Sequence, residues 1–265
     1  MLILINIEQN PHQQYILIKI LHPYPALLLE HENKKNILIA DLHIGFEQRF
    51  VDTGININTS TRTIENNLKF IIKKFKPDNI IMLGDIKDSI TRINTIEKKT
   101  IPLLFDKLID ETNVTIVRGN HDAKIETIMP KEVKIEKATG IKIGNTALFH
   151  GHTKLNSEFA EVDRVIMGHL HPTYSRKGNP VSGSQSWISL RVKKKYIFET
   201  EKEEYVEITI LPTFKTELTS SGFTSKKGKI ISPLIRKVHQ HIDEAAISSL
   251  KGDIIGNKNA LKYVL

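Results

Sequence analysis

Five short polar clusters along the chain contain the residue types that bind divalent metal ions. They hold six of the eleven histidines and are Asp41-Leu42-His43, Gly84-Asp85-Ile86-Lys87-Asp88, Gly119-Asn120-His121-Asp122, His150-Gly151-His152 and Gly168-His169-Leu170-His171. Each cluster follows an apolar run that is typical of a buried parallel strand. Side chains at the carboxyl ends of neighbouring strands meet at one edge of an open α/β sheet. The clusters therefore predict a two-metal hydrolase site.

Seven side chains in these clusters are candidate metal ligands: Asp41, His43, Asp85, Asn120, His150, His169 and His171. The first two and the last two lie two residues apart, so the side chains of each pair would point the same way on an extended segment. The carboxylate of Asp85 has two oxygens and can bridge two ions. Two ions about 3.5–4 Å apart can activate one water and hold phosphoryl oxygens. This set therefore predicts in-line attack on a phosphate ester by a metal-bridging hydroxide.

The remaining polar residues of the clusters suit supporting roles. His121, next to the candidate ligand Asn120, is expected to face the substrate, to stabilise the charge that develops at phosphorus and to protonate the leaving oxygen. Asp122 and Asp88 are suited to orienting a ligating or catalytic imidazole. For His152, contact with the substrate phosphate and a plain loop histidine remain alternatives.

The elements that must position these residues alternate between strand and helix in the first half of the chain. Strands are expected at Ile37–Ala40, Ile80–Leu83 and Val114–Val117, and helices at Thr59–Phe75 and Thr95–Glu111. Pro102 in the second helix predicts a late start or a kink. Later segments are mostly short strands. The order predicts an α/β protein with two packed sheets and helices outside them, a four-layer α-β-β-α sandwich.

The pattern weakens from Arg176 onward. Strands are expected at Trp187–Val192, Lys195–Phe198 and Tyr205–Leu211. We expect residues 1–215 to form the catalytic domain and residues 216–265 to form a peripheral β extension packed on the same domain.

Several polar or aromatic features have a structural explanation that we favour over a functional one. Trp187 is expected in the core rather than stacked on a base. The basic run Arg191–Lys195 is expected to be solvated, and His239 and His241 to lie on a solvated helical surface. Glu47 and Arg49 could reach a substrate, but an exposed first helical turn is the preferred interpretation.

Composition limits the metal and the partners. The chain has no cysteine, so nitrogen and oxygen must hold any metal ion. We expect two divalent ions, with Mn first and Fe, Zn, Ni or Co as alternatives. The net charge of +8 and the pI of about 9.4 favour an anionic partner such as a phosphoester, a nucleotide or a nucleic acid. Surface lysines without a partner are an equally weighted explanation.

No apolar stretch approaches the roughly 20 residues that span a bilayer, so no membrane association is expected. The opening run Met1–Ile5 is short and lacks a basic start, which favours a strand over a secretory signal. A cytoplasmic location is the resulting expectation.

The five clusters, in their order, resemble those of the calcineurin-like metallophosphoesterase superfamily. The resemblance covers residues 37–172 and implies a β-sandwich flanked by helices. It assigns Asp41, His43, Asp85 and His171 to a first metal site and Asp85, Asn120, His150 and His169 to a second. It makes His121 the residue that acts on the leaving group and Asp122 its orienting partner. Lys87 lies where many members have an apolar residue.

The stretches at 41–47 and 168–172, with Ile210-Leu211-Pro212, are similar to a narrower group. It comprises archaeal phosphoesterases related to the SbcD nuclease subunit and bacterial relatives associated with DNA ligase. The leading hypothesis is a metal-dependent phosphodiesterase acting on nucleotides or nucleic acids. A DNA or RNA nuclease in repair is the first alternative. A non-catalytic scaffold is the second, against which the retention of His121 and all seven candidate ligands counts.

Overall fold

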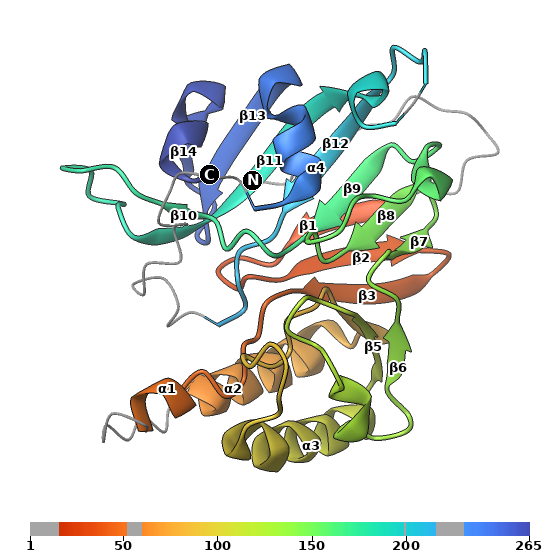
Figure 1. The fold of residues 1–265 in the computed structure, drawn as a ribbon, viewed down its shortest axis with the longest axis vertical. Coiled ribbons are helices and arrows are strands. Elements are labelled where there is room, and N and C mark those ends of the chain that lie inside the picture. Colours follow the sequence, from red (N-terminus) through yellow and green to blue (C-terminus); the bar gives the residue numbers. More distant parts are fainter. Residues whose placement is uncertain (1–15, 52–59, 199, 216–230) are drawn as a thin grey trace.

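The computed structural model describes residues 16–51, 60–198, 200–215 and 231–265, and it shows two sheets between outer helices (Figure 1). The first sheet holds, in spatial order, β1 (Leu17–Ile20), β2 (Leu27–His31), β3 (Lys34–Ile39), β4 (Asn79–Met82), β5 (Asn113–Val117) and β6 (Lys134–Glu136). The second holds β14 (Ile254–Asn257), β13 (Ile242–Ser249), β11 (Ser184–Lys193), β12 (Tyr205–Ile210), β9 (Arg164–Met167), β8 (Thr146–Phe149) and β7 (Ile141–Ile143), with β10 (Thr173–Tyr174) paired to β11. The predicted α/β class and four-layer sandwich are confirmed.

Parallel strands lie at the centre of both sheets. β3, β4 and β5 run parallel in the first sheet, and β8, β9 and β12 run parallel in the second. Antiparallel strands β1 and β2 lie on one side of the first sheet, whereas β6 at its other edge runs parallel to β5. Because neighbouring parallel strands end at the same edge of a sheet, the segments that follow them are brought together.

Helices cover the outer face of the first sheet. α2 (Ser60–Phe75) forms there because Ile64, Leu68 and Ile71 repeat along one face and are fully buried. α3 (Thr95–Ile109) lies beside it, and the short α1 (Gln48–Val51) precedes both (Figure 1). No helix in the described ranges has the length and apolar character needed to cross a membrane.

The start of α3 is fixed by a capping box. The side chain of Asn94 accepts a hydrogen bond from the N–H of Glu97, and the carboxylate of Glu97 accepts one from the N–H of Asn94. The helix therefore begins at Thr95, although Pro102 lies in its middle. The expected late start is wrong, because the cap stabilises the turns that precede the proline.

Alternation along the strands divides the core into three layers. In β3, Ile37 and Ile39 pack with the helices, whereas Leu38 packs between the two sheets. In β8, Phe149 packs with α4 (Pro233–Val238) on the second sheet, whereas Leu148 packs between the sheets. A slip of one residue would turn these side chains to the wrong face, so burial fixes the register of the strand ends.

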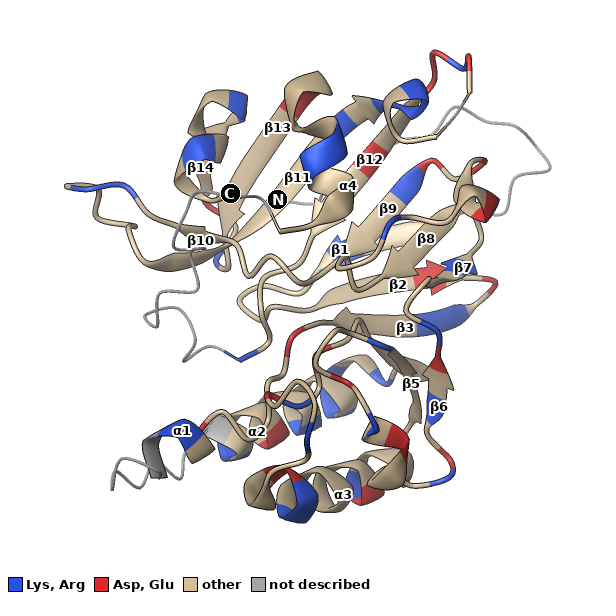
Figure 2. Ribbon diagram, viewed as in Figure 1, with Lys and Arg blue, Asp and Glu red and all other residues tan. Residues whose placement is uncertain are grey.

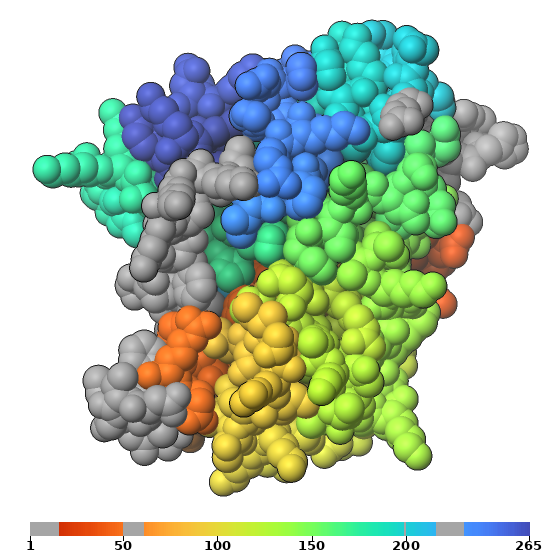
Figure 3. Space-filling model, viewed as in Figure 1, coloured from red at the N-terminus to blue at the C-terminus, as the bar shows by residue number. Residues whose placement is uncertain are grey.

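The C-terminal segment extends the second sheet. β13 pairs with β11 along its length, and β14 pairs with β13 at the edge. The C-terminal residues, blue in Figures 1 and 3, therefore lie on the second sheet, whereas residues of the first half cover the opposite end of the molecule. The division into 1–215 and 216–265 stays a prediction, because residues 216–230 lie outside the described part.

Two expectations for the later segments are wrong. The segment Lys195–Phe198 is not a strand, because a 3-10 helix occupies Lys194–Tyr196. The basic run 191–195 is not wholly solvated either. Lys194 is buried, and its ammonium lies 3.2 Å from a carboxylate oxygen of Asp163 and 2.9 Å from one of Glu204. These partners are 31 and 10 residues away, so the local pattern gave no sign of the burial.

Other expectations agree with the structure. Trp187 is buried between the two sheets. His239 and His241 are exposed on a 3-10 helix, with the ring of His241 stacked on that of Tyr196 at 3.9 Å between centroids. The opening run 1–5, which was expected to form a strand, lies outside the described residues.

Replacing Leu148 by alanine tests the central layer. The side chain of Leu148 is fully buried between the sheets, so we expect Leu148→Ala to lower the free energy of unfolding by about 2–5 kcal/mol. Leu103→Ala is the control, since Leu103 is 55% exposed and its truncation should change that free energy by less than about 0.5 kcal/mol. Denaturant titration of both variants measures the difference, and equal effects would contradict the layer assignment.

Candidate metal centre

The five polar clusters lie together at the carboxyl ends of β3, β4, β5, β8 and β9. Backbone hydrogen bonds join these ends within each sheet: the N–H of Asp41 donates to the carbonyl of Gly84 at 3.1 Å, and the N–H of Gly168 donates to that of His150 at 3.0 Å. The two sheets are joined where the N–H of His169 donates to Asp41 Oδ2 at 2.9 Å. The site therefore spans the edges of both sheets.

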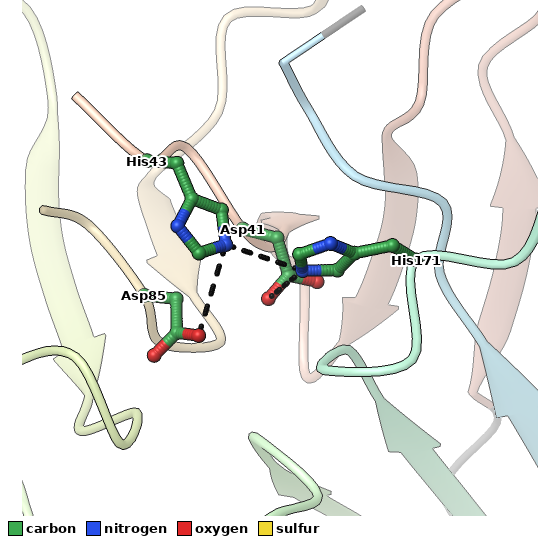
Figure 4. A group of neighbouring side chains, drawn as sticks. All are labelled: Asp41, His43, Asp85 and His171. Carbon is green, nitrogen blue, oxygen red and sulfur yellow. Dashed lines mark hydrogen bonds and ion pairs between the residues drawn. The ribbon is translucent and has the colours of Figure 1, made fainter. Parts of the chain in front are cut away.

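Four side chains form a first group, and Figure 4 shows them pointing toward one another: Asp41, His43, Asp85 and His171. Their ligand atoms all lie within 4.8 Å of one another. Nε2 of His171 lies 3.2 Å from Nε2 of His43 and 3.2 Å from Oδ1 of Asp41. Nε2 of His43 lies 3.7 Å from Oδ2 of Asp85.

Asp85 also belongs to a second group, with His150 and His169, whose ligand atoms again lie within 4.8 Å of one another. Nε2 of His150 lies 3.3 Å from Asp85 Oδ2 and 3.2 Å from the amide oxygen of Asn120. Six of the seven expected ligand residues thus fall into two adjacent groups that share Asp85, and the seventh, Asn120, contacts His150 of the second group. Their role as ligands stays a prediction.

The geometry of these groups fits divalent cations. Asp41 Oδ1 is buried and has no hydrogen-bond partner. Two imidazole nitrogens face each other at 3.2 Å in His43 and His171, and their lone pairs repel unless a proton or a cation lies near them. A buried carboxylate oxygen without a hydrogen bond, such as Asp41 Oδ1, calls for a ligand. Imidazole and carboxylate donors suit Mn, Fe, Zn, Ni and Co ions.

Outer partners direct the ligand nitrogens inward. Nδ1 of His150 donates to the carbonyl of Leu83 at 2.7 Å, which leaves Nε2 for an ion. Nδ1 of His43 faces Asp88 Oδ1 at 3.5 Å, as predicted for Asp88. The guanidinium of Arg49 binds the other oxygen of Asp88 at 2.9 Å, so Arg49 is not simply part of an exposed helical turn.

The sequence led us to expect the paired ligands on extended backbone. The structure shows that they do not lie on extended backbone. Five residues of the two groups have positive φ: Asp41 (61°), His43 (43°), Asp85 (53°), His169 (71°) and His171 (44°). Each left-handed non-glycine residue costs of order 1–3 kcal/mol, and such strain is typical of functional sites. The chain therefore curls at each strand end, and it is this turn that points both side chains of a pair at the centre.

Two glycines allow the backbones to approach the carboxylates. A Cβ atom at Gly168 would lie 2.7 Å from Asp41 Oδ2, and one at Gly119 would collide with Asp85 Oδ1. Any larger residue at either position would displace a candidate ligand. The glycines in the clusters thus serve close approach as well as turns.

Burial and charge move the pKa values of the site histidines in opposite directions. Burial lowers the pKa of His43, and it lowers that of His169 to about 3, so both imidazoles are neutral. At His150 burial acts in the same direction, but the charges of Asp85 and Asp41 outweigh it and raise the pKa to about 9. Although burial opposes it, His150 holds the pKa of Asp85 below its usual range. A cation at this site must therefore displace a proton from His150.

His121 lies at the edge of both groups. Its Nδ1–H donates to the backbone carbonyl of Asp88, and its Nε2 lies 3.9 Å from Asp85 Oδ2. Its ring meets that of His43 edge to face at 5.0 Å between centroids. The side chain of His121 is 14% exposed, so it is accessible to a bound substrate.

Asp122, which the resemblance makes the orienting partner of His121, makes its hydrogen bonds to the backbone, and its role toward His121 stays a prediction. Its buried carboxylate accepts hydrogen bonds at 2.8 Å from the backbone N–H groups of Asp85, Ile86 and Gly119. The partner of the His121 ring is the Asp88 carbonyl instead. Asp122 thus locks the second and third clusters together, because a carboxylate can accept several amide hydrogen bonds at once.

His152 lies near the second group without joining it. Its ring is 5.2 Å from that of His150 and 6.0 Å from that of His169, between centroids. Burial, with the charge of His150, lowers its pKa to about 4, and its Nδ1 is buried without a hydrogen-bond partner. A neutral histidine beside the centre fits substrate contact, which stays a prediction.

Sequence reasoning missed a segment that supports the first cluster. The hydroxyl of Thr213 donates to the carbonyl of Asp41 at 2.6 Å. The ammonium of Lys215 lies 3.3 Å from the carbonyl oxygen of His43. The same ammonium binds Glu47 at 3.1 Å. Glu47 is therefore buried, and its expected place on an exposed helical turn is wrong. The two charges are 168 residues apart, so no local pattern could show the pairing.

Comparison with solved structures gives a likeness in fold. The Pseudomonas putida nuclease MPE is 18% identical, with a TM-score of 0.55 over 90% of this chain and 93% of that one. A protein of unknown function from Aquifex aeolicus (AQ665) is 18% identical, with a TM-score of 0.39 over 65% of this chain and 94% of that one. The E. coli phosphoesterase Yfce is 14% identical, with a TM-score of 0.37 over 84% and 97%. The last two scores are too low for a shared fold to be concluded from them.

Comparison with proteins of curated function gives no match. Residues 35–152 match the model of the calcineurin-like phosphoesterase family, a range that contains four of the five clusters. This match supports, over these residues, the superfamily predicted from the clusters, and the chain is a metal-dependent phosphoesterase.

Proposed function

We propose that this phosphoesterase is a dinuclear phosphodiesterase that hydrolyses nucleotide or nucleic-acid phosphodiesters. The observation that carries the proposal is the sharing of Asp85 by two ligand groups, with His121 at their edge. The net charge of +8 supports an anionic substrate of this class. Mn as the metal, a cytoplasmic location and the narrower group of SbcD-related enzymes stay predictions.

The shared carboxylate of Asp85 would join two metal sites. Seven side chains would hold the two divalent ions: Asp41, His43, Asp85, Asn120, His150, His169 and His171. When bound, such ions supply an activated water and charge stabilisation for the phosphoryl oxygens. The outer partners Leu83 and Asp88 keep Nε2 of His150 and His43 turned inward. The carboxylate of Asp122 accepts hydrogen bonds from the loop after β4 and from the loop after β5, which holds these two loops together.

His121 would act on the leaving group. Its Nδ1 proton is held by the Asp88 carbonyl, so Nε2 is the atom that faces the centre. A protonated Nε2 can donate to the leaving oxygen as the ester bond breaks. His152 would contact a phosphoryl oxygen from the side of the second group.

Hydrolysis of a diester by His121→Ala tests this role. We expect kcat to fall by about 100- to 10,000-fold on a dinucleotide, whose alkoxide leaving group needs a proton. The loss on bis-p-nitrophenyl phosphate should be smaller, because nitrophenolate leaves without one. The measurement is Mn-dependent hydrolysis of both diesters and of p-nitrophenyl phosphate by protein that was first stripped of metal.

His241→Ala is the matched control, since His241 is exposed on the 3-10 helix His239–His241, outside both ligand groups, and should retain full activity. Equal activity of His121→Ala and the unmodified chain on the dinucleotide would contradict the proposed role. Faster hydrolysis of the monoester than of the diesters would contradict the preference for diesters.

Metal affinity should rise with pH between about 6 and 9. Below its raised pKa of about 9, His150 carries a proton that a cation must displace, so metal binding near neutral pH releases protons. Calorimetric titration with Mn in two buffers of different ionisation enthalpy measures this release. A binding enthalpy that is independent of the buffer would contradict the protonation of His150.

The Asp85→Asn substitution should weaken Mn binding by more than about 10- to 100-fold, which is the effect of losing an outer partner of a ligand.

A nuclease is the second candidate, and one surface feature favours it. The hairpin between β10 and β11 follows the ligand His171 and carries Arg176 and Lys177, both exposed. Figure 2 shows Lys and Arg positions, in blue, at the tip of a segment that protrudes beside β10. The guanidinium of Arg176 also lies over the ring of Tyr263, 5.2 Å from its centroid. Basic side chains on a segment that begins only a few residues after His171 could bind the backbone of a nucleic acid.

Alanine at both Arg176 and Lys177 tests the nuclease. We expect the slope of log KM against log salt for single-stranded DNA to decrease by about two, one for each lost phosphate contact. Hydrolysis of bis-p-nitrophenyl phosphate should not change. Alanine at Lys98 and Lys99, an exposed basic pair on α3, is the control and should leave both substrates unaffected. A role for the hairpin would be contradicted if both double variants cleaved DNA normally. It would also be contradicted if both lost DNA cleavage to the same extent.

A further inference from the structure

Lys87 is buried without a carboxylate partner in hydrogen-bond contact. Its side chain is 0% exposed, and its ammonium donates to three backbone carbonyls, those of Ser89, Ile90 (3.4 Å) and Arg92 (3.0 Å). An ammonium has three N–H donors, so these carbonyls match its full capacity. A buried charge is tolerated only when it is hydrogen-bonded, and here the loop supplies all of the bonds.

The loop that Lys87 holds begins with the residue that contacts the centre twice. The carboxylate of Asp88 faces Nδ1 of His43 at 3.5 Å, and the carbonyl of Asp88 accepts from Nδ1 of His121. On its near side, the N–H of Asp88 donates to the carbonyl of Ile44 at 3.0 Å. In the residues that follow Asp88, Lys87 binds the carbonyls of Ser89, Ile90 and Arg92. The orientation of the Asp88 carbonyl is therefore set from both directions along the chain.

The peptide bond between Asp88 and Ser89 has its other end fixed as well. The N–H of Ser89 donates to Glu97 Oε1 at 2.7 Å, and Glu97 is fully buried in the first turn of α3. The side chain of Asn94 donates to the hydroxyl of Ser89 at 3.1 Å and to the carbonyl of Gly45 at 3.2 Å. The loop is thus closed onto the start of α3, with the ammonium of Lys87 as its interior bond donor.

We propose that Lys87 is a positioning residue for His121, acting through the carbonyl of Asp88. By holding the loop 89–92, Lys87 keeps that carbonyl aimed at Nδ1 of His121, which fixes the tautomer and turns Nε2 toward Asp85. The inference rests on the proposed role of His121 in leaving-group protonation. It assigns a function to a lysine at a position where the resemblance leads one to expect an apolar side chain.

Lys87→Met tests the proposal, because methionine has a similar length and no donors. Small displacements of a catalytic group lower rates by up to about 100-fold, so we expect kcat to fall by roughly 10- to 100-fold on the diester that shows the largest loss in His121→Ala. KM and the number of Mn ions bound should stay unchanged, since the ligands remain. A purely structural role would lower the unfolding midpoint and leave kcat unchanged at temperatures where the protein is folded.

Lys194→Met is the matched control. Lys194 is the same residue type and is also buried, but its ammonium binds Asp163 and Glu204 rather than a loop of the centre. We expect this variant to lose stability and to retain kcat. It therefore separates the loss of a buried ammonium from the loss of the contact that positions His121.

The decisive arm combines Lys87→Met with His121→Ala. If Lys87 acts through His121, the lysine substitution lowers kcat less than about two-fold once His121 is absent, because two residues of one unit are non-additive. An unchanged kcat in Lys87→Met, or the same fold-loss in both backgrounds, overturns the inference alone. Full activity of His121→Ala would overturn the proposed role of His121 and the inference together.

Should Lys87→Met yield no folded protein, Lys87→Arg takes its place. Arginine keeps the charge but presents a planar fork that cannot reproduce the three bonds of an ammonium. A loss of kcat that disappears in the His121→Ala background supports the proposal, and a loss that persists there overturns it.

Discussion

The buried carboxylate of Asp85 is the group on which the arrangement of the centre depends. It is 2% exposed, and its Oδ2 faces imidazole nitrogens of His150 at 3.3 Å, His43 at 3.7 Å and His121 at 3.9 Å. A buried anion is stable only when it is paired or hydrogen-bonded. The strand ends therefore curve around this carboxylate, and the left-handed backbone of Asp85 itself is part of that curvature.

Asp122 shows how the loops meet the requirement that Asp85 creates. Burial and the nearby charge of Asp85 raise the pKa of Asp122, so its carboxylate needs compensation. Three backbone N–H groups supply it, two from the cluster after β4 and one from Gly119 after β5. The same bonds that stabilise the anion hold neighbouring loops in one register. Electrostatic compensation and loop geometry are thus one interaction rather than two.

Much of the fold follows from short-range patterns, and the departures have a common cause. The alternation of Ile37, Leu38 and Ile39 divides the core between helices and sheet, and polar clusters at strand ends predict convergence. The exposed turn expected at Glu47 is instead buried by Lys215, a partner that folding brings from a distant segment. The positive φ values of the ligands could not be predicted either, because they arise from the packing of several strand ends and not from the preferences of Asp or His.

The distribution of charge gives the centre its dependence on cations. The chain as a whole carries +8, which favours the approach of a polyanion, but four buried carboxylates lie in or beside the centre: Asp41, Asp85, Asp88 and Asp122. The ammonium of Lys87 is buried near them and offsets only part of this charge, because it is one positive charge beside four carboxylates. A phosphate group would be repelled from such a cluster at close range. Bound divalent ions would make the local electrostatic potential at the centre positive. An anionic substrate that the net positive charge attracts could then also bind at the centre.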